Sequence, residues 1–75
     1  MTPQQSRAAR GWLDWSQEEL AAKAAVSAST VRDFEKGRRD PIANNLAAMR
    51  AALESAGIAF VDTSGISYAK RGKRR

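Results

Sequence analysis

The sequence predicts a single, mainly α-helical domain of four helices that ends in a short β-strand or hairpin. Three observations predict it. Apolar residues recur at helical spacing in four segments. Short stretches with helix caps and helix stops separate these segments. After Gly57 the apolar period changes to two, which is typical of strands.

The first predicted helix runs from Pro3 to about Leu13. Thr2 offers a capping hydroxyl, and the missing N–H of Pro3 costs nothing at the first helical position. Ala9 and Leu13 are four residues apart and therefore lie on one face of the helix. We expect that face to point inward.

The second and third predicted helices are close neighbours along the chain. Ser16 and Glu19 have the spacing of a capping box, which begins a helix of about eight residues. Ser27 caps a third helix of about ten residues that ends at Gly37, because glycine tolerates the left-handed closing conformation. Only residues 25–26 are left for the turn, so the two helices must cross steeply.

The rest of the chain predicts one more helix and a β appendage. An exposed loop around Pro41 leads to a fourth helix over roughly Asn45 to Ala56, which Gly57 stops. Residues 58–69 read as a strand or hairpin. The alternating apolar residues of this segment must pack on the helices or pair with a second subunit. They are therefore candidate dimer contacts. These residues are Ile58, Phe60, Ile66 and Tyr68.

Composition limits the possible functions of this 75-residue chain. It has no cysteine and no histidine, which removes thiolate catalysis, sulfur-ligated zinc and the commonest general base. We therefore expect no enzyme activity, no cofactor and no metal. No stretch approaches the ~20 apolar residues that span a bilayer, so we expect a cytoplasmic protein without a membrane segment.

The formal net charge of +5 comes from the C-terminal tail, residues 70–75. Residues 1–69 hold eight Lys or Arg and eight Asp or Glu, which cancel. A basic tail is either a solvated end or an arm that binds phosphates. Its five cations are Lys70, Arg71, Lys73, Arg74 and Arg75.

The segment SQEELAAKAAVSASTVRDFEKG resembles the helix-turn-helix of the Cro and phage-repressor family, the XRE family of bacterial regulators. The matching residues are Gln17, Leu20, Ala21, Ala24, Val26, Val31, Phe34 and the closing Glu35 to Gly37, and the resemblance covers residues 5 to about 56. It implies a lambda-repressor-like four-helix fold, with a helix-turn-helix over 17–37 in a domain over 1–69. It also implies binding to double-stranded DNA and regulation of transcription.

One position departs from the family pattern, and one pair of charges adds to the resemblance. The turn residue, usually glycine in the family, is Ala25, and a left-handed alanine costs about 1–2 kcal/mol. A different turn geometry is the alternative. The family pairs an arginine of its first helix with the glutamate that ends its third, here Arg10 with Glu35. The alternative is that Arg10 and Glu35 are two unrelated surface charges.

The resemblance places the first two turns of the third helix in the DNA major groove. The implied base readers are Ala28, Ser29, Arg32 and Asp33. An arginine could grip guanine and an aspartate could accept from cytosine. Arg32 is our preferred specificity residue, and the alternative is that Arg32 and Asp33 belong to an ordinary solvated face.

Other residues could contact the DNA backbone, or bases and backbone together. Gln17 matches the family's phosphate clamp. Phosphate contacts position a reader without choosing a sequence. The remaining candidates are Ser27, Thr30, Lys36, Arg38, Arg39, Asn44 and Asn45, and those around the loop are otherwise plain solvated residues.

One helix reads only a few base pairs, so we expect a homodimer on a palindromic operator. Through its DNA binding, we expect the protein to be associated with the nucleoid. A second hypothesis is an antitoxin-like module that neutralises a partner protein through residues 58–69 and autoregulates its operon.

Overall fold

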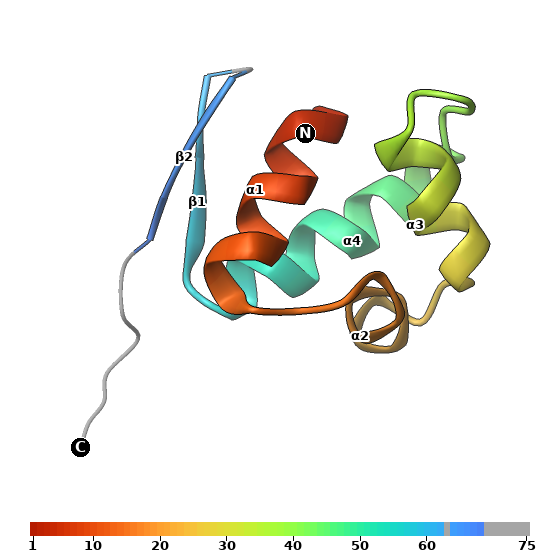
Figure 1. Cartoon of the computed structure of the whole chain (residues 1–75), viewed down its shortest axis with the longest axis horizontal. Helices are drawn as coiled ribbons and strands as arrows, with labels where there is room; N and C mark the ends of the chain where they lie inside the picture. The colour runs from red at the N-terminus through yellow and green to blue at the C-terminus, as the bar shows by residue number, and fades with distance from the viewer. Residues whose placement is uncertain (63, 69–75) are drawn as a thin grey trace.

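The computed structural model describes residues 1–62 and 64–68 and confirms the predicted fold class: four helices followed by a two-stranded antiparallel hairpin (Figure 1). Within these residues, no helix is both long and apolar enough to cross a membrane. The elements are α1 (Pro3–Leu13), α2 (Gln17–Ala24), α3 (Ala28–Glu35), α4 (Ala43–Ser55), β1 (Ile58–Val61) and β2 (Gly65–Tyr68).

The first three helices begin at hydroxyl caps. The hydroxyl of Thr2 accepts from the backbone N–H of Gln5, and that of Ser16 accepts from Glu19. Both caps are reciprocal, because the side chain at the third helical position accepts from the backbone N–H of the cap residue. The hydroxyl of Ser27 accepts from the N–H of Thr30. Sequence-local hydrogen bonds thus set where α1, α2 and α3 begin.

The bounds of α3 and α4 differ from the prediction. Helix α3 has eight residues and ends at Glu35, not Gly37. Gly37 instead has a φ of 73° in the turn beyond it, and its N–H donates to the carbonyl of Phe34. Helix α4 begins two residues before Asn45, because the carbonyl of Ile42 accepts from the N–H groups of residues 45 and 46.

The core lies where the four helices meet. Leu20, Val31, Met49 and Leu53 are fully buried, and each comes from the apolar face of its helix. Ala21 is also buried, and its small side chain allows α2 to approach its neighbours closely. This packing fixes α3 against the rest of the molecule.

The turn between α2 and α3 has the left-handed geometry that the family's glycine would suit. Ala25 adopts φ 57° and ψ 41°, and its N–H donates to the carbonyls of Ala21 and Ala22. Val26 donates to the carbonyl of Ala21 at 3.0 Å. The turn keeps the expected geometry despite the cost of a β-carbon there.

The hairpin packs its inner face on the helices. Ile58 lies opposite Tyr68 and Phe60 opposite Ile66, so all four side chains share one face. Ile58 is buried, and Phe60 and Ile66 are partly buried against the core. The candidate dimer contacts are thus largely used within the protomer, with Tyr68 the most exposed of them.

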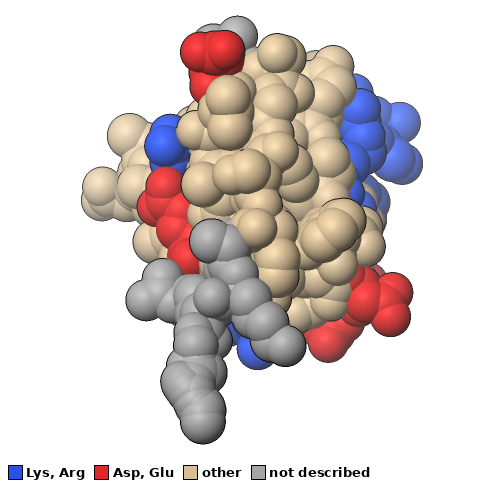
Figure 2. Space-filling model, turned by 90° about the vertical axis from the view of Figure 1, so that its left-hand side faces the viewer, with Lys and Arg blue, Asp and Glu red and all other residues tan. Residues whose placement is uncertain are grey.

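The side of the molecule that carries the hairpin is mostly uncharged, with charged side chains near its margin (Figure 2). Its exposed large apolar side chains are Trp12, Val61 and Tyr68. The rings of Trp12 and Tyr68 lie 5.6 Å apart between their centroids. In Figure 1 the hairpin and α3 are at opposite ends of the molecule, so this face is separate from α3.

Candidate nucleic-acid interface

Helix α3 has a buried side and an exposed side. Val31, Phe34 and Glu35 face the interior. Ser29 is exposed and Arg32 and Asp33 are half-buried, so these polar side chains lie on the other side of the helix. The core holds the helix while its outer face stays accessible to a ligand.

Hydroxyl groups cluster at the N-terminal end of α3. The Oγ of Ser27 lies 3.1 Å from the Oγ of Ser29 and 2.8 Å from the Oγ1 of Thr30. Ser27 therefore both caps the helix and orients its neighbours. Ala28 is half-buried and packs partly against the core, which limits how much of its methyl group is free for a base contact.

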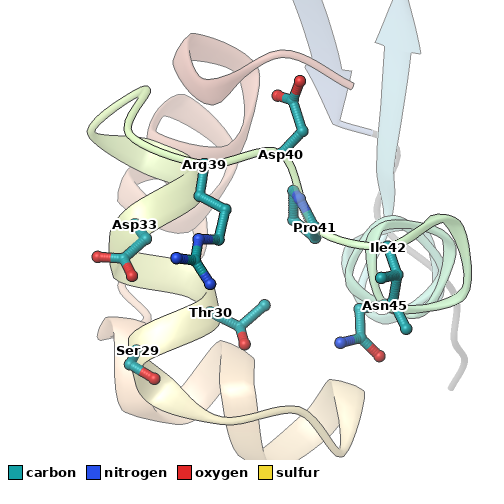
Figure 3. A pocket seen from close by; sticks show the side chains of 8 residues that line it. All are labelled: Ser29, Thr30, Asp33, Arg39, Asp40, Pro41, Ile42 and Asn45. Carbon is teal, nitrogen blue, oxygen red and sulfur yellow. The ribbon is translucent and has the colours of Figure 1, made fainter.

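A cleft of about 240 Å³ separates α3 from the beginning of α4. Arg39 extends into it from the connecting loop, and Thr30 and Asn45 flank it from the two helices (Figure 3). Asp33 lines the cleft from α3, and Asp40 lines it from the loop (Figure 3). One cation, two carboxylates and neutral polar groups thus adjoin the exposed face of α3.

Three residues that line this cleft are not among the predicted DNA contacts: Asp40, Pro41 and Ile42. Ile42 is 68% exposed beside the polar groups. No periodic signal marks a single apolar residue in a loop. Its position beside α3 is visible only once the loop is folded.

A buried carboxylate joins α1, α2 and α3. Glu35 is 2% exposed, and both of its oxygens accept hydrogen bonds from Arg10, at 2.6 and 2.8 Å. Ser6 donates to the same carboxylate at 2.5 Å. Arg7 donates to the backbone carbonyl of Glu35. The two charges that the resemblance pairs therefore form an ion pair in the structure.

The charges of this pair are mutually stabilised. Burial alone would raise the pKa of Glu35, but hydrogen bonds from Arg10, Ser6 and Gln17 outweigh it, so the pKa lies below its ordinary value. The hydrogen bond to Glu35 raises the pKa of Arg10. Both groups are charged at neutral pH.

Gln17, the first residue of α2, contacts the same carboxylate. Its Nε2 donates to the Oε1 of Glu35 at 3.2 Å. The side chain is half-buried, so part of it is accessible at the beginning of α2. The candidate phosphate clamp is thus connected to the end of α3.

The other candidate backbone contacts surround α3 without forming one cluster. Lys36, Arg38 and Arg39 are exposed after the end of α3. Asn44 and Asn45 lie in the first turn of α4 rather than in the loop before it. The tail candidates, residues 70–75, lie outside the described residues.

Among residues 1–62 and 64–68, no three side chains of the metal-ligating types come together to hold an ion.

Two crossing helices joined by a tight turn, the second with an exposed polar face, define a helix-turn-helix protein. A family model for helix-turn-helix domains of the Cro/C1 type matches residues 7–57, and the chain belongs to this family, the XRE family of DNA-binding transcription regulators. This is not a family of enzymes. No curated protein matches the chain closely enough to add a more specific activity.

Proposed function

We propose that the chain reads a palindromic operator with α3 in the major groove and regulates transcription from it in the cytoplasm. The observation that carries this proposal is the outer face of α3, where Ser29, Arg32 and Asp33 are accessible while the core holds the other face. The major groove admits an α-helix and shows a distinct pattern for every base pair.

Each accessible side chain has a chemical role in the proposal. Arg32 donates to O6 and N7 of guanine, and Asp33 accepts from N4 of cytosine. Ser29 contacts either kind of base, and the methyl of Ala28 contacts a thymine methyl. Ser27 and Thr30 contact bases or the adjoining phosphates.

Backbone contacts fix the register of α3 in the groove. Gln17 supplies one at the beginning of α2. The cations and amides around the loop supply others: Lys36, Arg38, Arg39, Asn44 and Asn45. The tail cations of residues 70–75 add phosphate contacts that do not depend on sequence.

A homodimer provides the two reading helices that a palindrome requires. The uncharged face around Trp12 and Tyr68 favours the hairpin side as the contact between subunits. We expect Trp12→Ser to weaken self-association, measured by sedimentation equilibrium, whereas Ala22→Ser on the exposed side of α2 leaves it unchanged.

The same face gives the antitoxin-like alternative a specific surface, since it could cover a partner protein instead of a second copy. The two differ in stoichiometry. A protein that is monomeric when free and on DNA, but forms a 1:1 complex with a neighbouring gene product that Trp12→Ser abolishes, supports the alternative.

Selection of bound sequences from a random DNA pool tests the proposal. We expect enrichment of two related half-sites in inverted orientation. Recovery of sequences with no common motif would contradict sequence-specific reading.

A further inference from the structure

Resting on the proposed DNA contact of Gln17, we propose that Glu35 is a positioning residue for DNA binding: it fixes the side-chain amide of Gln17 for a phosphate although it does not touch DNA itself. The juxtaposition that points to this is the hydrogen bond of 3.2 Å from Nε2 of Gln17 to Oε1 of Glu35.

The carboxylate determines which end of the amide faces it. An ionised carboxylate only accepts hydrogen bonds, so Gln17 must present its nitrogen to Glu35 and not its oxygen. Nε2 carries two hydrogens, and only one is used in this bond. Among the described residues, the second hydrogen has no protein acceptor, and it is the donor that a phosphate oxygen needs.

Glu35 is itself held in place. Arg10 donates to both carboxylate oxygens and, through Nη1, to the backbone carbonyl of Trp15 just before α2, at 3.0 Å. Ser6 donates to Oε2, the oxygen that Gln17 does not use. The acceptor for Gln17 is therefore fixed relative to both α1 and the beginning of α2.

This arrangement orders the side-chain amide of Gln17 before DNA binds. A free glutamine side chain loses rotamer freedom when it contacts a phosphate, which weakens binding. Gln17 loses less, because Glu35 already restricts it. The ion pair thereby supports a DNA contact in addition to joining α1 to α3.

A double-mutant cycle measures the coupling. We expect Gln17→Ala to weaken binding about tenfold, as for one hydrogen bond to a charged group, on every DNA sequence alike. Glu35→Gln should cause a similar loss of affinity when residue 17 is glutamine. It should cause no further loss when it is combined with Gln17→Ala. Equal losses in both backgrounds would overturn the proposal. The control Gln4→Ala, at an exposed position of α1 outside this network, should leave affinity within about twofold.

A second measurement on the unmodified protein applies if Glu35→Gln does not fold. In proton–nitrogen spectra, the two Nε2 hydrogens of Gln17 should exchange slowly in the free protein, and one should shift strongly when the selected operator is added. If the Nε2 hydrogens of Gln17 exchange as fast as those of exposed Gln4, or if neither signal shifts when the operator binds, the proposal is overturned. If the wild type binds no DNA at all, the proposed function itself fails.

Discussion

The side-chain amide of Gln5 in α1 donates a hydrogen bond of 2.9 Å to the backbone carbonyl of Gly65 at the beginning of β2. It also donates to the carbonyl of Asp62 at 3.2 Å, and Gln5 is 1% exposed. One buried amide thus attaches the hairpin turn to the first helix.

This attachment predicts a stability difference between two substitutions. Gln5→Ala removes the donor of two carbonyls, which costs about 1–3 kcal/mol. Gln5→Glu costs more, because it places an acceptor against two acceptors. Urea unfolding measures both, with exposed Gln4→Ala as the control expected to lie within about 0.5 kcal/mol of wild type. Equal stability of all three variants would refute the attachment.

Gln5 also shows where sequence reasoning reaches its limit. The helix caps and the inward face of α3 could be predicted, because each depends on residues within a few positions of one another. The burial of Gln5 and Ser6 could not, since their partners lie 60 and 29 residues further along the chain. Local spacing alone makes both residues look solvated.

The candidate site divides in the same way. The spacing of Val31 and Phe34 predicts which face of α3 is exposed. The cleft between Thr30 and Asn45 depends on how the loop folds back beside α3, and no local pattern encodes it. The contact between Gln17 and Glu35 likewise requires the crossing angle of two helices.

The left-handed Ala25 predicts a stabilising substitution. Ala25→Gly relieves about 1–2 kcal/mol of strain but adds freedom to the unfolded chain, so we expect a net gain of about 0.5–1 kcal/mol and a melting temperature several degrees higher. The control Ala22→Gly, in the helical exposed part of α2, should lose about 1 kcal/mol. A lower melting temperature for Ala25→Gly would show that the turn is unstrained.

The Glu35 carboxylate predicts how stability depends on pH. Because its pKa is lowered in the folded state, its contribution is complete above the ordinary glutamate pKa of about 4.3 and is lost as pH falls through the folded value. Wild type should therefore lose more stability than Glu35→Gln when the pH is lowered below about 4.3. At neutral pH, Glu35→Gln should be less stable by roughly 3 kcal/mol, since Arg10 loses its partner. If the free energies of unfolding of wild type and Glu35→Gln, measured in urea, change in parallel with pH, this role of the Glu35 carboxylate is contradicted.

The basic tail predicts a change in salt dependence. Each phosphate that it neutralises steepens the slope of log K against log salt by roughly 0.9. Removal of residues 70–75 should weaken binding to all sequences and flatten the slope by several units at most, while the preferred sequence stays the same. A truncated chain with unchanged affinity and slope would make the tail a solubilising end only.

The reading role of α3 is tested most directly by binding titrations on operators varied one base pair at a time, with wild type and with Ser29→Ala, Arg32→Ala and Asp33→Ala. We predict that Arg32→Ala removes the preference at one position in each half-site, a loss of about 1–3 kcal/mol, and keeps it elsewhere. If all three variants keep the wild-type preference at every position, α3 is not the helix that reads the operator.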